Sequence, residues 1–467
     1  MEFFKKIFKT KTHLKNENLY EQDFGLCPEC KQPNTYYNWC KECYSKKFEQ
    51  NFDKWTSNEK QLDEFIRMSQ LEAKNSLELL EWIPYSRLRD IKFLARGGFG
   101  TVYDALWLDG WIIKWDYTKQ DWERNVNKLD EQDFKDAVNP KIENRLESNE
   151  KYGFRVVLKS LDNSSDINEN FLNESKLHYQ CQCEISSTND GFTSAPLIGI
   201  TQDPHTSNYM IVMRKIENGS LRMNLFTKKY NPNDKFYNLY LISLQLEAMH
   251  KLNLIHGDIH GGNILCLDHA TVLFSDFGLC RLADQPNTEN TIFGVLPYVA
   301  PEILRRKTYT KAADIYSFGM IMWEMTSGSI SFHDVPHDAI LAIKICQGFR
   351  PEIIEGTTPE YAELMKRCWD RDPAERPTAE ELKNFFYEWS EKHPIEMDEE
   401  MRTPIPDENE GELEIYSTSK FDINCGYISI PLITEELVED SVTTEGVKFV
   451  IYDRKPDKRK ANFELID

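Results

Sequence analysis

The chain has 467 residues, of which 40% are hydrophobic and 28% are charged, which is enough apolar material for two or three packed domains. Lysine and arginine number 56 against 77 aspartates and glutamates, so the net charge is −21. A chain this acidic is poorly suited to general binding of nucleic acids or anionic membranes, and none of its apolar runs reaches the roughly 18 residues that a transmembrane helix needs.

The cysteines and the first residues predict a reducing compartment. The 11 cysteines are an odd number, and seven of them are scattered along the chain rather than arranged as a disulfide framework. The start MEFFKKIFKT lacks the apolar segment of a secretory signal, and Glu2 excludes N-myristoylation. We therefore expect a cytoplasmic protein without a membrane anchor, and access to the nucleus stays open.

Two C-x-x-C pairs, nine residues apart, follow a polar, basic leader that we expect to be flexible over residues 1–24. The four cysteines are Cys27, Cys30, Cys40 and Cys43. Four thiolates at this spacing are a ligand set for one tetrahedral, structural Zn²⁺, which would hold residues 25–48 in shape because so short a segment cannot build its own core. The alternative is free cysteines or a redox pair, but a redox pair needs only one C-x-x-C within a βαβ unit.

The spacing of this zinc module partly resembles that of small zinc fingers that bind single-stranded RNA or ubiquitin. Its spacer is one residue shorter than theirs, and their leading tryptophan is missing. Basic and aromatic contacts are available from Lys31, Tyr36, Tyr37, Lys41, Lys46 and Lys47. We favour a protein partner of the zinc module over RNA.

Composition divides the rest of the chain. Helical spacing of apolar residues predicts a linker helix over 56–83, and residues 86–392 alternate strand-like and helix-like segments. Within them, 117–150 is highly charged and is predicted to be a surface insertion. The tail over 393–467 holds 19 acidic and 8 basic residues, so we expect it to be largely disordered, with short strands or docking segments near 427–430 and 447–452.

A glycine-rich turn opens the central domain. Its members are Leu94, Ala95, Arg96, Gly97, Gly98, Phe99, Gly100 and Val102. Glycines let backbone N–H groups approach phosphate oxygens, although a hairpin turn without a ligand is an equal alternative for this motif alone. Lys159 then closes a β-branched strand, and Glu174 follows 15 residues later in a predicted helix. Such a pair could hold a lysine against phosphate groups.

The stretch HGDIHGGNIL over 256–265 is followed by DFG at 276–278 and APE at 300–302. In order and spacing, these motifs, the turn, the lysine and the glutamate resemble the signature set of the protein kinase family over residues 86–392. The later Cys-Trp…Arg-Pro segment over 368–377 is most similar to the tyrosine-kinase-like branch. The resemblance implies an α+β, bilobal fold, in which a small antiparallel β lobe with one key helix precedes a larger, mainly helical lobe.

The resemblance implies a role for each catalytic residue in transferring the γ-phosphate of ATP to a protein hydroxyl. Lys159 would contact the α- and β-phosphates while Glu174 holds it, and Asp258 would accept the hydroxyl proton of the substrate. Asn263 and Asp276 would bind Mg²⁺ or Mn²⁺ through oxygen atoms.

The resemblance also assigns positions around the adenine and in the larger lobe. Met213 falls at the gatekeeper position and Ile216 on the hinge, while Val157 replaces the usual alanine over the adenine ring. Glu302 and Arg376 are expected to form a buried ion pair that holds shape and does not contact substrate.

Several positions depart from the family pattern, and they keep two functions open. Ala95 replaces the first glycine of the turn, Gly257 an arginine that normally receives an activation-loop phosphate, and His260 a lysine that usually contacts the γ-phosphate. Val295 replaces a threonine common in serine/threonine kinases. We expect an active protein kinase in intracellular signalling that acts on serine and threonine more than on tyrosine. The alternative is a pseudokinase scaffold or a nucleotide-gated interaction protein with a zinc docking module.

Overall fold

The computed structural model describes residues 24–97, 100–139, 142, 144–161, 164, 169–186, 195–226, 234–267, 271–285, 292–395 and 430–433. They belong to two compact units, which we describe separately. The first unit extends to Leu79 and takes in Ile112–Arg124, and the second unit contains the remainder. The chain therefore leaves the first unit, returns to it once and leaves it again.

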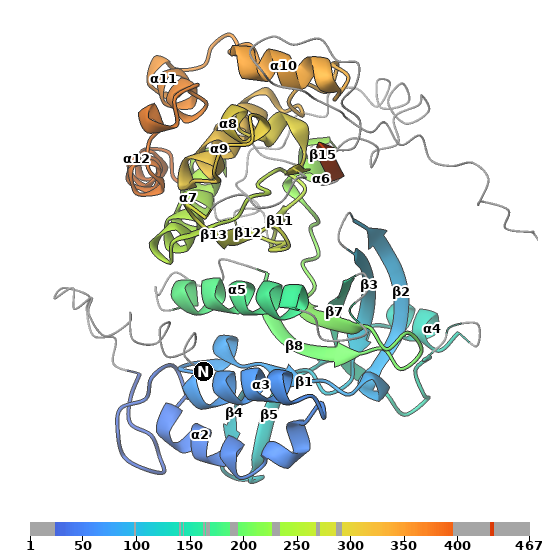
Figure 1. Ribbon diagram of the computed structural model, residues 1–467. Coiled ribbons are helices and arrows are strands. Elements are labelled where there is room, and N and C mark those ends of the chain that lie inside the picture. Colours follow the sequence, from blue (N-terminus) through green and yellow to red (C-terminus); the bar gives the residue numbers. More distant parts are fainter. Residues whose placement is uncertain are drawn as a thin grey trace, which may run out of the picture. The chain divides into compact units, whose positions relative to one another are not determined.

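The first unit is built around aromatic and cysteine side chains. Its helices are α2 (Lys41–Glu49) and α3 (Lys60–Glu72), and its hairpin pairs β4 (Trp111–Asp116) with β5 (Asp121–Asn125). Figure 1 shows the hairpin beside α2. The buried core consists of Cys27, Trp39, Cys40, Cys43, Tyr44, Phe48, Ala73, Leu79 and Ile112. Rings and sulfur atoms predominate in this cluster, and α3 adds the buried side chains Leu62, Phe65 and Ile66.

The helix expected over 56–83 is shorter in the structure, because α3 ends at Glu72. Asn75 explains the early end: its side chain accepts a hydrogen bond from the backbone N–H of Leu77 and starts a short 3₁₀ turn. Asparagine side chains compete with helical hydrogen bonds in this way. The spacing of apolar residues continued beyond the break and gave no sign of it.

The expected surface insertion over 117–150 is divided between the two units. Its first part completes the hairpin β4–β5 in the first unit. Its second part forms β6 (Asn127–Lys128) and α4 (Glu131–Ala137) in the second unit, where Ala137 and Leu146 are buried against Leu106 and Leu108. The composition of this charged segment does not reveal that Ala137 and Leu146 are buried against the sheet.

The second unit contains a seven-stranded sheet in the order β1–β8–β9–β7–β3–β2, with β6 beside β7. The strands are β1 (Glu81–Trp82), β2 (Leu88–Arg96), β3 (Gly100–Trp107), β7 (Tyr152–Leu161), β8 (Leu197–Gln202) and β9 (Tyr209–Arg214). All its pairings are antiparallel except that of β1 with β8. Helix α5 (Glu169–Ser186) contacts β8, and Figure 1 shows it alongside the sheet. The predicted small antiparallel lobe with one key helix is confirmed.

The rest of the second unit is mainly helical. Its helices are α6 (Leu221–Phe226), α7 (Lys235–Lys251), α8 (Pro301–Leu304), α9 (Lys311–Ser327), α10 (Ala339–Gln347), α11 (Pro359–Cys368) and α12 (Ala379–Lys392). The short strands are β10 (Leu254–Ile255), β11 (Ile264–Cys266), β12 (Val272–Phe274), β13 (Arg281–Leu282) and β14 (Ile292–Gly294). Residues 313–325 of α9 are buried without interruption, so this helix lies in the core. The predicted bilobal α+β fold is confirmed.

One segment of the tail is described. Ile430–Ile433 form β15, which pairs antiparallel with β14 so that Gly294 lies opposite Ile430. The leader, the segment near 447–452 and the remaining tail lie outside the described residues. Among the described helices, none is both long and apolar enough to cross a membrane.

A buried ion pair connects α8 with the segment before α12, as predicted. Arg376 donates from Nη1 and Nη2 to the two carboxylate oxygens of Glu302 at 2.7 and 2.8 Å. It also donates to the carbonyl oxygens of Asp370 and Ala312. Both side chains are buried, so the pair orders two segments that lie 74 residues apart.

Removing one partner of this pair should be costly. Arg376→Met leaves the Glu302 carboxylate buried and unpaired, and we expect it to lower the free energy of unfolding by about 3–5 kcal/mol. Urea unfolding followed by tryptophan fluorescence measures this loss. The double variant Arg376→Met/Glu302→Leu removes both charges and should recover part of it. A loss below about 1 kcal/mol for Arg376→Met would contradict the ordering role.

Candidate functional site

Lys159 on β7 reaches two carboxylates from different parts of the chain. Its Nζ lies 2.6 Å from Oε1 of Glu174 on α5 and 2.7 Å from Oδ1 of Asp276. Burial alone would lower the pKa of Lys159, but the charges of Asp276 and Glu174 outweigh it and hold that pKa above its usual value. The site therefore keeps a positive charge on a side chain that is 8% exposed.

The two carboxylates differ in their access to solvent. The side chain of Glu174 is 9% exposed and that of Asp276 is 35% exposed. Burial raises the pKa of Glu174, whereas at Asp276 the charge and hydrogen bond of Lys159 overcome burial and lower the pKa. Asp276 is thus an ionised oxygen ligand within reach of a cation, and Glu174 serves to hold Lys159.

The turn at Asp276–Gly278 has a constrained backbone. Asp276 has φ of +59°, a left-handed conformation that is uncommon for non-glycine residues, although aspartate and asparagine adopt it more readily than most. A Cβ on Gly278 would come within 3.1 Å of Oδ1 of Asp276, which accepts the backbone N–H of Gly278. A side chain at this position would therefore push the Asp276 carboxylate by a few tenths of an ångström.

Asp258 lies in the loop between β10 and β11, where Asn263 binds it. Nδ2 of Asn263 donates to the carbonyl oxygen of Asp258 at 2.9 Å and to its Oδ2 at 3.1 Å. Because Nδ2 is used in this way, Oδ1 of Asn263 is the atom that could meet a cation. The backbone of Asn263 also accepts from Ser275, next to Asp276. The expected Mg²⁺ ligands Asn263 and Asp276 therefore lie on adjoining segments and offer the oxygen atoms that this ion prefers.

The loop is anchored from the core. Asp314 on α9 accepts the backbone N–H groups of His256 and Gly257 at 2.8 and 2.9 Å. Gly257 has φ of +77°, and a Cβ there would lie 2.9 Å from the carbonyl oxygen of Leu279. The positive φ and the close carbonyl oxygen both disfavour any side chain at position 257, including the arginine of the expected pattern.

A stack of rings that sequence analysis missed connects α5 with this loop. His178 stacks on Phe277 with ring centroids 4.3 Å apart, and His256 lies 5.4 Å from the same ring. Burial lowers the pKa of His178 to about 4, so the ring is neutral. His178 comes four residues after Glu174, and this helical spacing is the signal that could have revealed it.

The glycine-rich turn and the adenine positions follow the sheet. Leu94, Ala95 and Arg96 end β2, Gly97 follows, Gly100 and Val102 begin β3, and Gly98 and Phe99 lie outside the described residues. A Cβ on Gly100 would lie 2.1 Å from the carbonyl oxygen of Ser160, so close strand packing alone requires this glycine. Val157 lies opposite Met213, and Ile216 is buried just after β9.

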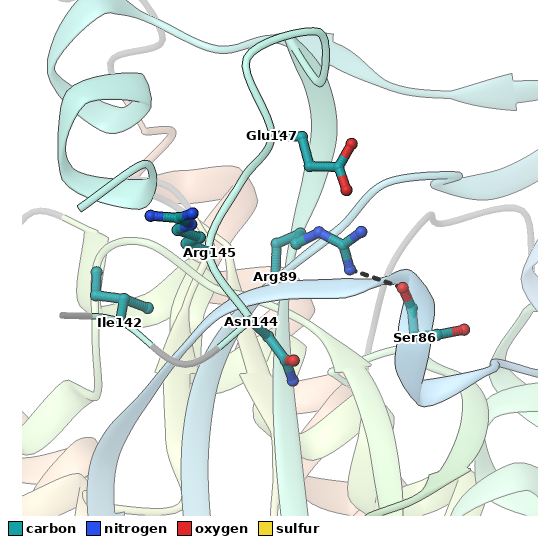
Figure 2. A pocket seen from close by; sticks show the side chains of 6 residues that line it. All are labelled: Ser86, Arg89, Ile142, Asn144, Arg145 and Glu147. Carbon is teal, nitrogen blue, oxygen red and sulfur yellow. Dashed lines mark hydrogen bonds between the residues drawn. The ribbon is translucent and has the colours of Figure 1, made fainter. Parts of the chain in front are cut away.

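A hollow of about 520 Å³ lies away from these residues, and Figure 2 shows its lining. The lining residues are Ser86, Arg89, Ile142, Asn144, Arg145 and Glu147. Arg89 donates to the carbonyl oxygen of Ser86 and makes two 2.9 Å bonds to Glu150. Its charge is therefore already neutralised, and the hollow offers no strong anion site through Arg89.

The four cysteines of the first unit come together as predicted. Their Sγ atoms all lie within 4.8 Å of one another, with 3.8 Å between Cys27 and Cys43 and 3.6 Å between Cys30 and Cys40. Tetrahedral Zn²⁺ with Zn–S bonds of about 2.3 Å needs sulfur atoms roughly 3.8 Å apart. The cluster thus has the size and the donor set of a structural zinc site.

The electrostatics of the cluster also favour a bound cation. Burial and the neighbouring thiols raise the pKa of Cys43 well above its usual value, and burial raises that of Cys40 to about 11. At Cys27, backbone N–H groups of Cys30 and Glu29 overcome burial and lower the pKa to about 6. Ionisation of the Cys40 and Cys43 thiols is therefore favoured by a positive charge in the cluster.

The hairpin β4–β5 packs around this cluster. The hydroxyl of Tyr117 lies 3.8 Å from Sγ of Cys27, and the ring of Trp122 stacks on Phe48 at 4.4 Å. The backbone N–H of Trp115 donates to the hydroxyl of Tyr44 at 3.1 Å. The cysteines thus support a segment about 70–90 residues further along the chain.

The proteins and the family model that this chain resembles are all described as kinases. A family model described as "Protein tyrosine and serine/threonine kinase" matches residues 124–386. The serine/threonine/tyrosine-protein kinase HT1 of Arabidopsis thaliana is 34% identical over 173 residues, which are 36% of this chain and 44% of HT1. The serine/threonine-protein kinase STY17 of the same plant is 31% identical over 142 residues, 30% of this chain and 25% of STY17. The chain thus spans less than half the length of these relatives.

Acid should weaken the fold through His178. An unfolded histidine has a pKa near 6.5, and that of folded His178 is about 4. Between these values the unfolded state binds the extra proton, so the contribution of His178 to stability falls as the pH falls from 6.5 to 4. His178→Phe keeps a ring against Phe277 and should show a smaller drop in Tm from about pH 7 to pH 5 than wild type. The exposed His205→Gln is the control, and equal drops in all three proteins would contradict this role.

Loss of one cysteine ligand should release the metal. We expect about one equivalent of zinc per wild-type chain and clearly less for Cys43→Ser, measured by atomic absorption. Limited proteolysis within residues 24–79 should become faster in that variant. Cys183→Ser, outside the cluster, is the matched control. Zinc-free wild-type protein that resists proteolysis as well as the zinc-bound form would show that the metal is not structural.

Proposed function

Because the chain belongs to the protein tyrosine and serine/threonine kinase family, we propose that it transfers the γ-phosphate of ATP to hydroxyl groups of proteins. One observation carries the proposal: Lys159 is bound to Glu174 and Asp276 at once, while Asp258 and Asn263 lie hydrogen-bonded beside them. Phosphoryl transfer depends on positioning and on neutralising charge, and this arrangement supplies both.

Each residue has a distinct task in this reaction. Lys159 offers a permanent cation to the phosphate oxygens, and Glu174 keeps it in place. Asp258 accepts the proton of the attacking hydroxyl, and the bond from Asn263 orients its carboxylate. Bound Mg²⁺ would neutralise the phosphates, with Asp276 and Asn263 as its protein ligands.

Serine and threonine are the proposed acceptors, with tyrosine as a secondary one. The printed names of HT1 and STY17 support this, since both include serine/threonine and one adds tyrosine. Within this proposal the protein acts in the cytoplasm, which agrees with the finding that none of the ten described cysteines forms a disulfide. The four-cysteine cluster would be a structural zinc site that docks a protein partner.

A nucleotide-gated scaffold is the second candidate function. It is favoured by His260, which replaces a lysine and which burial keeps neutral by lowering its pKa well below the usual value. Lys159 and Asp276 would still bind a nucleotide with its cation, whereas transfer would be slow.

Two substitutions separate these functions. Asp258→Asn should reduce phosphate transfer from labelled ATP to a protein panel by about 10²–10⁴-fold while ATP binding changes little, because Asp258 acts on the hydroxyl. Lys159→Met should weaken both transfer and nucleotide affinity. Equal transfer by wild type and Asp258→Asn, or none by wild type with any substrate, would favour the scaffold.

A further inference from the structure

Arg222 on α6 reaches the catalytic loop through His260. Its Nη2 lies 3.0 Å from Nδ1 of His260, and its backbone N–H donates to the carbonyl oxygen of Gly261 at 2.8 Å. On the other side of the imidazole, Nε2 of His260 is 3.8 Å from Oδ2 of Asp258. His260 and Asp258 are 5% and 6% exposed. Arg222 and His260 are therefore hydrogen-bonded, and the buried ring lies next to the proposed catalytic base at a distance longer than a hydrogen bond.

The hydrogen bonds decide which nitrogen of His260 carries the proton. Nδ1 lies 3.0 Å from the backbone N–H of Gly262 as well as 3.0 Å from the guanidinium of Arg222. Both of these groups can only donate, so Nδ1 must accept and the proton of the neutral ring is on Nε2. Because Nδ1 accepts both hydrogen bonds, the ring carries a single proton and is neutral. The Nε2–H group consequently faces the carboxylate of Asp258.

Gly262 makes room for this arrangement. A Cβ there would lie 2.8 Å from Cε1 and 2.9 Å from Nδ1 of His260, and 3.1 Å from Nη1 of Arg222. At Gly261 the nearest atoms, in Arg222 and Glu324, would be 3.4 Å away. The missing side chain at position 262 is therefore needed by the contact between Arg222 and His260, whereas position 261 would tolerate a methyl group better.

The charge of Arg222 is balanced away from Asp258. Glu324 on α9 is buried and accepts hydrogen bonds from the hydroxyl of Tyr298 and from the backbone and side chain of Ser331. Burial raises the pKa of Glu324, and the nearby Arg222 charge opposes this rise. The guanidinium thus lies near a second carboxylate, while the ring of His260 stands between it and the catalytic one, which also accepts a hydrogen bond from Asn263.

We propose that Arg222 is a positioning residue that fixes the Nε2–H tautomer of His260, and that this imidazole orients the carboxylate of Asp258 toward the substrate hydroxyl. The inference rests on the proposed phosphate transfer. A full positive charge at position 260 would pair with Asp258 and make it a weaker base, because a nearby cation stabilises the ionised carboxylate. A neutral donor orients the carboxylate with a smaller loss of basicity.

The kinetic experiment uses the full chain with ATP and a protein substrate. Arg222→Met should lower kcat about tenfold and change KM for ATP by less than about twofold, since the change misorients the base but leaves Lys159 in place. Arg222→Lys keeps a donor and a charge and should recover part of kcat. Gly262→Ala should resemble Arg222→Met, and Gly261→Ala should lose less. Met223→Ala, exposed on the same helix, is the control without effect.

A double-mutant cycle distinguishes positioning from a general loss of structure. If Arg222 acts through His260, adding Arg222→Met to His260→Phe should lower kcat by less than about twofold further. Two losses that multiply would overturn the inference, and so would a loss confined to KM for ATP.

The tautomer itself gives a readout that needs no activity. Imidazole ¹⁵N chemical shifts of histidine-labelled protein should show His260 as the Nε2–H form in wild type and as a mixture in Arg222→Met. An Nδ1–H form in wild type would overturn the inference. If wild type transfers no phosphate but shows the Nε2–H form, the proposed function fails while the positioning of His260 by Arg222 stands.

Discussion

The arrangement of the site depends on one buried ammonium group. Lys159 is 8% exposed, and a buried charge is tolerated only when it is paired and hydrogen-bonded. Its two partners come from residues 15 and 117 positions further along the chain, so α5 and the turn after β12 must both meet β7. The stack of His178 on Phe277 joins the same helix and turn through apolar surface. The ion pairs of Lys159 and the stack of His178 on Phe277 therefore both hold α5 next to the turn after β12.

Close packing, more than ligand binding, accounts for several glycines. Gly100 lies against Ser160, Gly257 against Leu279 and Gly262 against His260, and a Cβ at any of them would approach a neighbour to less than 3.0 Å. Gly257 also has a left-handed backbone. Two departures from the family pattern, Gly257 and His260, therefore fit the local packing. Gly257 allows the backbone of Leu279 to approach the catalytic loop, and Gly262 leaves room for the imidazole of His260.

In the first unit, the core that contains the four cysteines packs against a hairpin that lies far along the sequence. The hairpin β4–β5 lies in sequence between β3 and β7, which are neighbours in the sheet, yet its rings pack on the cysteine-containing core. Around the cysteines, aromatic rings and sulfur atoms supply most of the buried surface of this small unit. Residues 112–124 thus belong to the first unit, although the chain immediately before and after them belongs to the second unit.

By itself, the sequence determined what depends on residue type at fixed spacing. The spacing of the four cysteines pointed directly to a metal site. The Lys159–Glu174 pair, the Asp258–Asn263 loop and the Glu302–Arg376 ion pair were expected from the resemblance of several ordered motifs to one family, because each motif retains the side chains that its role needs. Only the tertiary structure decided where α3 ends, how residues 117–150 divide between the units, and that Arg222 and His178 join the site. Helix α3 ends because the side chain of Asn75 accepts a hydrogen bond from the backbone N–H of Leu77. Trp122 packs against Phe48, which is far from it in the sequence. Arg222 precedes His260 by 38 residues, and nothing in their spacing indicates contact, because that contact exists only once α6 lies against the loop.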